Sequence, residues 1–172
     1  MFEMFVNVLL CLVIGVCVYW DLKSRRIPNF VTLPTIIIAP VLNGVFWGLP
    51  GLKSSLAGFF IGLAVLIIPF ALGGMGGGDV KFLAAIGAMK GSPFILYAAV
   101  YSAFAGGIMA LGVLLYRGQL LTLLKKWIFA LINVFVPGVV SIPKIDSESI
   151  DKQVLPYGVA IGVGTVFALL VT

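Results

Sequence analysis

Two aspartates stand out in this chain because of where they lie. Asp79 closes a glycine-rich run that begins at Gly73, and both Asp79 and Asp21 follow stretches apolar enough to cross a membrane. Apart from Glu3, they are the only acidic residues among the first 145. A carboxylate at the edge of a bilayer is costly to hold and usually marks function. Two carboxylates that meet can share one proton and activate water, which is the chemistry of an intramembrane aspartyl protease.

The composition fixes the class of protein. Hydrophobic residues make up 62% of the 172-residue chain and charged residues 10%, and the mean hydropathy is +1.22. A soluble domain of this size could not hide so much apolar surface. We therefore expect an all-α, multi-pass membrane protein in which residues 1–172 form a single membrane-embedded domain. The lipid bilayer is an expected partner, and nucleic acid is not.

Apolar stretches predict about six spanning helices. They are roughly Met4 to Trp20, Phe30 to Trp47, Ser55 to Leu72, Val80 to Met89, Phe94 to Tyr116 and Leu155 to Val171. The stretch Leu120 to Val140 is interrupted by Lys125, Lys126 and Pro137, and we interpret it as a cytoplasmic interfacial helix, with a seventh span as the alternative. The first 20 residues are interpreted as a retained helix, because no basic segment precedes them and no small-x-small cleavage site precedes Asp21.

The cysteines indicate packing rather than a bound metal. Cys11 and Cys17 are six residues apart in the first predicted helix, so they fall on different faces, and the chain has no histidine. We therefore expect neither a disulfide nor a metal site.

The distribution of Lys and Arg predicts the orientation. If the first helix runs from outside to inside, only Lys53 and Lys90 lie outside. The nine basic residues then on the cytoplasmic side are Lys23, Arg25, Arg26, Lys81, Arg117, Lys125, Lys126, Lys144 and Lys152. This arrangement puts Asp21 and Asp79 on the same, cytoplasmic face, as a catalytic pair requires.

Each aspartate also has a plainer structural interpretation. Asp21 is followed by a basic segment and by the extended step Ile27-Pro28, which suits an ordinary cytoplasmic turn that opens the next helix at Pro28 or Asn29. Asp79 follows Gly76, Gly77 and Gly78, which suits a flexible connector capped by an aspartate. Under the functional interpretation, glycines let an extended substrate approach the backbone closely. A phosphate-binding loop is a poor fit, because no Gly-Lys-Ser/Thr follows and the acid would repel phosphate.

The two segments together resemble a known family. Asp-x-Lys-x-x-x-Ile-Pro-Asn, from Asp21 to Asn29, followed by Gly-x-Gly-Asp-x-Lys, from Gly76 to Lys81, is similar to the type IV prepilin leader peptidases, which are Gly-x-Gly-Asp membrane aspartyl proteases. Residues 82–88 resemble that family's fourth helix, and Leu155-Pro156-Tyr157-Gly158 resembles its Pro-Tyr/Phe-Gly element.

The resemblance implies a function and a location. Asp21 and Asp79 would be the catalytic pair of an endopeptidase that removes the short basic leader from type IV prepilins or pseudopilins, on the cytoplasmic side of the inner membrane. Such an endopeptidase would require no cofactor for proteolysis. The residues expected to bind substrate or shape the loops are Pro28, Asn29, Gly76, Gly77, Gly78, Lys81, Pro156, Tyr157 and Gly158. We expect the substrate's apolar helix to pack against small residues at Ala84 to Gly91 and Ala103 to Gly112.

The sequence departs from the longer family members in three ways. It lacks their zinc-binding insert with two Cys-x-x-Cys pairs, so it is similar to the short form found in tight-adherence pilus systems. Many long members also act as N-methyltransferases with S-adenosylmethionine, and no residue pattern here independently indicates such a site. Val159 stands where many members have a proline.

Two other classes of function stay open at this point. Asp21 and Asp79 could form the relay of a small proton- or cation-coupled transporter, which predicts acids nearer mid-helix and inverted repeats. A non-catalytic membrane assembly subunit would have dispensable acids.

Overall fold

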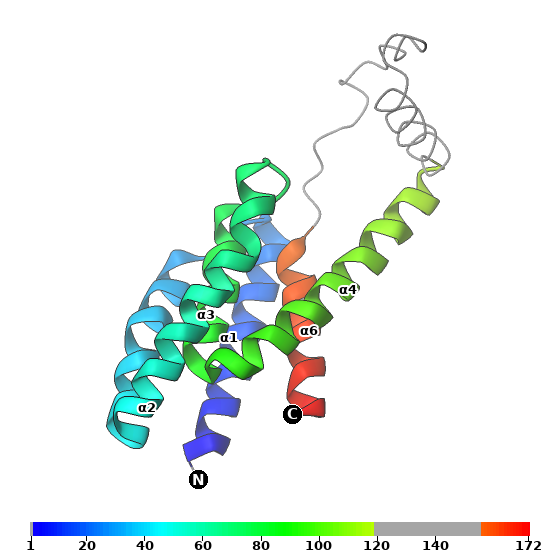
Figure 1. Ribbon diagram of the computed structural model, residues 1–172. Coiled ribbons are helices and arrows are strands. Elements are labelled where there is room, and N and C mark those ends of the chain that lie inside the picture. Colours follow the sequence, from blue (N-terminus) through cyan, green and yellow to red (C-terminus); the bar gives the residue numbers. More distant parts are fainter. Residues whose placement is uncertain (1, 119–155) are drawn as a thin grey trace, which may run out of the picture. The chain divides into compact units, whose positions relative to one another are not determined.

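The computed structural model describes residues 2–118 and 156–172, and the regular secondary structure of these residues is all helical, without any strand. The helices are α1 (Phe2–Ser24), α2 (Asn29–Ala71), α3 (Gly77–Lys90), α4 (Ser92–Tyr116) and α6 (Tyr157–Val171) (Figure 1). Within the described residues, α1, α2 and α4 are long and apolar enough to cross a membrane, and α6 is a shorter apolar helix. The predicted all-helical fold is confirmed for this part of the chain, whereas the count of six spans stays a prediction. The predicted interfacial helix at 120–140 lies outside the described residues.

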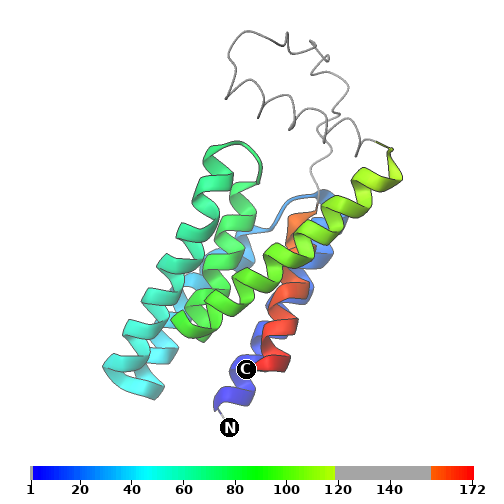
Figure 2. The ribbon, with the colours of Figure 1, turned by 45° about the vertical axis from the view of Figure 1, so that its right-hand side comes forward.

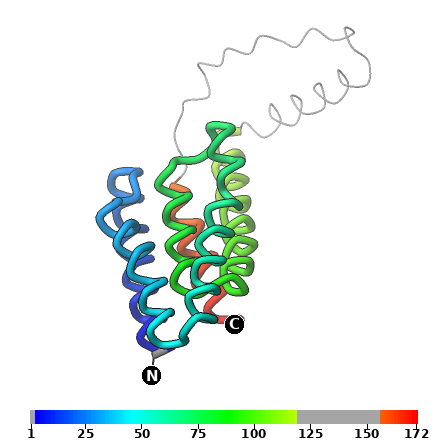
Figure 3. Tube along the Cα trace, turned by 60° about the vertical axis from the view of Figure 1, so that its left-hand side comes forward, coloured from blue at the N-terminus to red at the C-terminus, as the bar shows by residue number. Residues whose placement is uncertain are grey.

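Helix α2 contains a break that joins two of the predicted helices. Gly48 has φ 65° and ψ −155°, a conformation that favours glycine, and the 43-residue α2 reverses direction at this point. Figures 1 and 3 show its two limbs side by side, with the cyan turn between them. The limbs correspond to the predicted helices Phe30 to Trp47 and Ser55 to Leu72.

Helix α3 lies in the core, and its small residues allow α2 to approach closely. The backbones of Gly58 on α2 and Gly87 on α3 are in direct contact, and a Cβ on Gly62 would lie 2.7 Å from the Leu83 carbonyl oxygen. The buried Ser55 hydroxyl donates a hydrogen bond of 2.5 Å to the Ala88 carbonyl. Small residues permit this kind of close helix packing inside a membrane.

This packing corrects one expectation. The segment from Ala84 to Met89 is buried, with Ala84, Ala85 and Ala88 fully covered. Its small residues serve the contact with α2, so the prediction that this segment receives a substrate helix is wrong. Residues 103–112 of α4 are exposed or half-buried, and the corresponding expectation for them stays a prediction.

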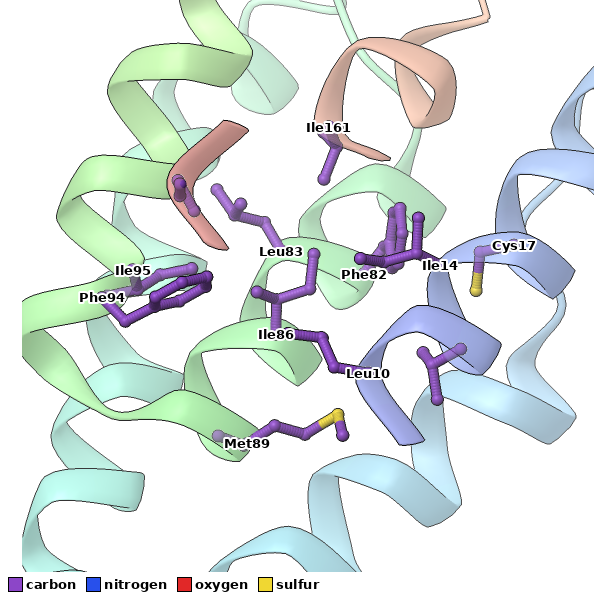
Figure 4. Close-up of a cluster of buried hydrophobic side chains, with 14 of the residues drawn as sticks. Leu10, Ile14, Cys17, Phe82, Leu83, Ile86, Met89, Phe94, Ile95 and Ile161 are labelled. Atoms are coloured by element: carbon purple, nitrogen blue, oxygen red, sulfur yellow. The ribbon is translucent and has the colours of Figure 1, made fainter. Parts of the chain in front are cut away.

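Side chains of α1, α4 and α6 pack against α3 and complete the core. Leu10 and Ile14 of α1 lie next to Phe82 and Ile86 of α3, and Ile161 of α6 joins them (Figure 4). Cys17 is buried in this cluster, whereas Cys11 is exposed, so the two free cysteines do lie on different faces of α1.

The far end of α3 is tied to the start of α1. The Lys90 ammonium lies 3.3 Å from Oε2 of Glu3 and donates a 3.0 Å hydrogen bond to Oδ1 of Asn7. Lys90 also lies over the ring of Phe94, 5.4 Å from its centroid. These contacts fix the ends of α1 and α3 that lie away from the two aspartates.

Candidate active site

Asp21 lies one turn inside α1 rather than at its end. The helix continues to Ser24, whose hydroxyl bonds the Trp20 carbonyl at 2.8 Å, and Arg25 ends it with φ 52°. The Arg25 amide still donates to the Asp21 carbonyl at 2.8 Å, so the aspartate backbone is held in the last helical turn. The side chain of Asp21 is 4% exposed. A carboxylate covered to this degree is costly to hold, and such an acid usually marks function.

The segment after α1 follows the predicted extended step. Pro28 has φ −73° and ψ 126° and caps α2, which begins at Asn29. The Pro28 carbonyl accepts hydrogen bonds from the amides of Val31 and Thr32, each at 3.3 Å. The turn is therefore set by proline chemistry and returns the chain directly into α2.

Asp79 is the third residue of α3, and the glycines before it shape its surroundings. Its carboxylate accepts a 3.1 Å hydrogen bond from the Gly76 amide, while the Gly76 carbonyl accepts one from the Asp79 amide at 3.1 Å. This reciprocal pair fixes the carboxylate at the helix start, where the macrodipole favours negative charge. Gly77 packs against the Phe70 ring, since a Cβ there would lie 3.4 Å from Cε2.

The environment of Asp79 changes its protonation. Asp79 precedes the apolar part of α3, outside the candidate membrane spans, and is 7% exposed. Burial raises the pKa of its carboxyl to about 6; the Gly76 amide opposes that rise, and the charge of Asp21 adds to it. The effect of Asp21 on Asp79 means that the two carboxylates lie within electrostatic reach of each other.

Contacts between the two aspartate segments bring the motifs together. The Lys81 ammonium donates a 3.2 Å hydrogen bond to Oδ1 of Asn29, across 52 residues of sequence. Gly78 lies against Ile27, because a Cβ on Gly78 would be 3.1 Å from the Ile27 Cβ. Two predicted residues of the second motif, Gly78 and Lys81, are therefore in contact with the first motif. The sequence places Ile27 in the extended step before Pro28 but gives no local signal for its contact with Gly78.

Helix α6 reaches Asp21 through the third predicted element. Pro156 caps α6, which starts at the half-buried Tyr157, and the Pro156 carbonyl accepts the Val159 amide at 3.1 Å. The backbone amides of Gly158 and Val159 face the Asp21 carboxylate. A Cβ on Gly158 would lie only 2.8 Å from Oδ2 of Asp21. The sequence suggested substrate binding or loop shaping for this element and missed its contact with the aspartate.

An apolar groove adjoins the site. It has a volume of about 290 Å³ and runs along α1 and α6. Its lining is entirely apolar: Ile14, Gly15, Val18, Val159, Gly162, Val163, Val166 and Phe167. Val18 lies about one turn before Asp21 on α1, and Val159 directly follows Gly158, so the groove begins beside the aspartate. Figure 2 shows α6 and α1 running alongside each other.

Metal chemistry has no evident ligand set in this part of the chain. Across residues 2–118 and 156–172, no three side chains of His, Cys, Asp or Glu meet to hold an ion. The cluster instead offers two covered carboxylates, backbone amides directed at each, and an adjoining apolar groove. Such a set suits proton transfer to and from water beside an extended chain.

Comparison with known proteins identifies the family. The sequence pattern of the type IV leader peptidase family matches residues 8–142, which include both aspartates. No curated protein and no solved structure matches the chain. Because the match covers well over half of the 172 residues, the chain belongs to the type IV leader peptidase family.

Proposed function

We propose that this chain is a membrane-embedded aspartyl endopeptidase that removes the basic leader from type IV prepilins or related pseudopilins. The observation that carries the proposal is the burial of both Asp21 and Asp79, on segments that touch through Gly78 and Ile27, in a chain of a leader peptidase family. The acids come from α1 and α3, and each lies within about one turn of a helix end. This position weighs against a transport relay, which would place the acids nearer mid-helix.

The pair performs hydrolysis by sharing a proton. One carboxylate is ionised and takes a proton from a water molecule as the water oxygen bonds to the scissile carbonyl carbon. The other carboxyl is protonated and gives its proton to the carbonyl oxygen. The raised pKa of Asp79, which is due first to its burial and then to the charge of Asp21, supports a protonated carboxyl beside an ionised one. Collapse of the tetrahedral intermediate re-forms the carbonyl and breaks the C–N bond, and a carboxyl gives its proton to the leaving amine.

The apolar groove supports a substrate with an apolar segment. A peptide bond held at Asp21 lies at one end of the groove between α1 and α6, so the chain on one side of that bond can continue along it. About 12 Å of α6 lines the groove from Val159 to Phe167. We infer that the groove receives the start of the prepilin's apolar helix, directly after the cleaved bond.

The charge distribution supports a cytoplasmic active site in the inner membrane. Lys23, Arg25 and Arg26 follow Asp21 within five residues, and Lys81 follows Asp79 by two. Basic residues at one end of membrane helices favour the cytoplasmic side. Lys90, at the other end of α3, is one of the two basic residues on the opposite side, where it pairs with Glu3.

Co-expression with a prepilin tests the proposal. The intact chain should convert the prepilin to a faster-migrating form, and Asp79→Ala at the same membrane level should not. Glu3→Gln is the matched control, since Glu3 is an acid at the opposite end of α1. Conversion by Asp79→Ala at the parent's level would show that the chain does not cleave through this carboxylate.

A further inference from the structure

The first turn of α6 holds the carboxylate of Asp21 at close range. The backbone amides of Gly158 and Val159 face that carboxylate, and Gly158 is itself buried. A Cβ built on Gly158 would lie 2.8 Å from Oδ2, 3.0 Å from Cγ and 3.1 Å from Cβ of Asp21. All three nearest atoms belong to the aspartate, so a side chain at residue 158 would first meet Asp21.

These distances leave room for a hydrogen but not for a methyl group. Carbon and oxygen atoms in a weak C–H···O contact are ordinarily about 3.3–3.6 Å apart. An alanine at 158 would therefore displace Oδ2 by roughly half an ångström or push α6 away from α1. Either movement would separate the amides from the carboxylate that they face.

The aspartate needs such a contact. Asp21 is 4% exposed, and its Oδ2 has no hydrogen-bond partner among the described residues. The unpaired amides at a helix N-terminus carry partial positive charge and stabilise an adjacent carboxylate. The buried Oδ2 is therefore stabilised by the partial positive charge at the start of α6. This close approach is possible because residue 158 has no side chain.

We propose that Gly158 is a positioning residue. By lacking a side chain, it lets the first turn of α6 hold the Asp21 carboxylate in place for proton transfer. This proposal rests on the proposed function, in which Asp21 is one of the catalytic pair. It goes beyond the family comparison, because the matched region ends at residue 142. It also gives the C-terminal helix a direct part in the active site.

The chain provides a matched control one turn further along the same helix. A Cβ on Gly162 would lie 2.6 Å from Cγ2 of Val18 and 3.1 Å from Cγ2 of Ile14, both on α1. Gly158→Ala and Gly162→Ala therefore add the same atom to the same helix interface with similar crowding. Only Gly158→Ala touches the aspartate.

The first test separates positioning from helix packing by kinetics. With purified enzyme and a prepilin substrate, Gly158→Ala should lower kcat about tenfold or more and leave KM within about twofold, because a displaced catalytic group acts on the chemical step. Gly162 lines the apolar groove, so Gly162→Ala is expected to act on KM, and its kcat should fall less than that of Gly158→Ala. Equal loss of kcat in both variants, or an unchanged kcat in Gly158→Ala, would overturn the proposal.

The second test needs no activity and works even if Gly158→Ala folds poorly. In the parent, Gly158→Ala should lower the thermal unfolding midpoint by about 2–4 °C or prevent folding. In the Asp21→Ala background the crowded carboxylate is gone, so adding Gly158→Ala should no longer lower the midpoint. Gly162→Ala should have the same effect in both backgrounds. If Gly158→Ala changes the thermal unfolding midpoint equally with and without Asp21, the proposed positioning of Asp21 by Gly158 is refuted.

The two tests also distinguish this inference from the proposed function. If Asp21→Asn cleaves prepilin normally, the aspartyl mechanism fails. The double-mutant comparison of unfolding midpoints still shows whether residue 158 positions Asp21. If Asp21→Asn is inactive and the unfolding midpoints show no coupling between residues 158 and 21, the mechanism stands and the positioning role of Gly158 is refuted.

Discussion

The contact between Gly78 and Ile27 predicts which glycine of the run tolerates a side chain least. A Cβ on Gly78 would lie 3.1 Å from the Ile27 Cβ, whereas carbon atoms pack best at about 3.5–4.0 Å. Either α3 or the turn before Pro28 must therefore move by roughly half an ångström. These two segments carry Asp79 and Asp21, so the movement falls on the geometry of the pair.

The expected magnitude follows from that displacement. A misplacement of about 1 Å at reacting groups costs about 100-fold in rate, so Gly78→Ala should lose about tenfold and Gly78→Val about 100-fold. These losses correspond to about 1.4 and 2.7 kcal/mol of transition-state stabilisation. Gly77→Ala is the control at the neighbouring position, because its Cβ would meet the Phe70 ring at 3.4 Å, an ordinary contact.

The assay is the initial rate of prepilin conversion in membranes at matched enzyme level. Gly77→Ala should cleave within about twofold of the parent. The reasoning would be refuted if Gly78→Val matched the parent, or if Gly77→Ala lost as much activity as Gly78→Ala. The first outcome would mean that the run is only a connector between α2 and α3, and the second that the loss of activity does not depend on the contact between Gly78 and Ile27.

Three further predictions concern stability, the groove and topology. Because folding raises the pKa of Asp79 to about 6, its ionised form destabilises the fold; Asp79→Asn should raise the thermal unfolding midpoint above about pH 6, and this gain should shrink toward about pH 4, whereas a pH-independent gain would contradict the burial argument. Gly15→Phe should fill the groove and raise KM several-fold with little change in kcat, and Ile37→Phe, at an exposed position of α2 outside the groove lining, should not; equal KM values for the two variants would remove the groove from substrate binding. In a background without the native cysteines, a cysteine at Ser24 should resist an impermeant thiol reagent added outside cells and one at Ser54 should react; the opposite pattern would invert the orientation.

The helices were predictable because apolar length carries most of the information in a membrane protein. The ends of α3 and α4 agree with the predicted stretches within about three residues, and the two limbs of α2 match two predicted helices. The exact end of α1 was not predictable, because Asp21 looked like the end of an apolar run. The backbone hydrogen bond from Arg25 to Asp21 carries the helix one turn further.

The contacts within the site were only partly predictable. The resemblance gave Asp21 and Asp79 as a pair, and their common side followed from charge. Which residues touch them depends on tertiary packing that no local pattern encodes, as with Ile27 against Gly78 and Gly158 against Asp21. A signal for the latter was present, since a proline and a glycine within three residues at a helix start indicate a close approach.

The burial of α3 also had a readable signal that was interpreted wrongly. Alanines and glycines from Ala84 to Gly91 permit close packing, and sequence alone does not say whether the partner is a substrate or another helix of the same chain. The partner is α2, through Gly58 and Gly62.

The most direct test of the central claim is cleavage by the two charge-neutral variants, Asp21→Asn and Asp79→Asn, in proteoliposomes with a purified prepilin. The product masses identify the cleaved bond, and Glu3→Gln controls for loss of an acid elsewhere. The account predicts that each asparagine variant inserts and folds but cleaves at least about 100-fold more slowly than the parent, because an amide can neither take nor supply the shared proton. Cleavage within about tenfold of the parent rate by either variant would contradict the aspartyl mechanism.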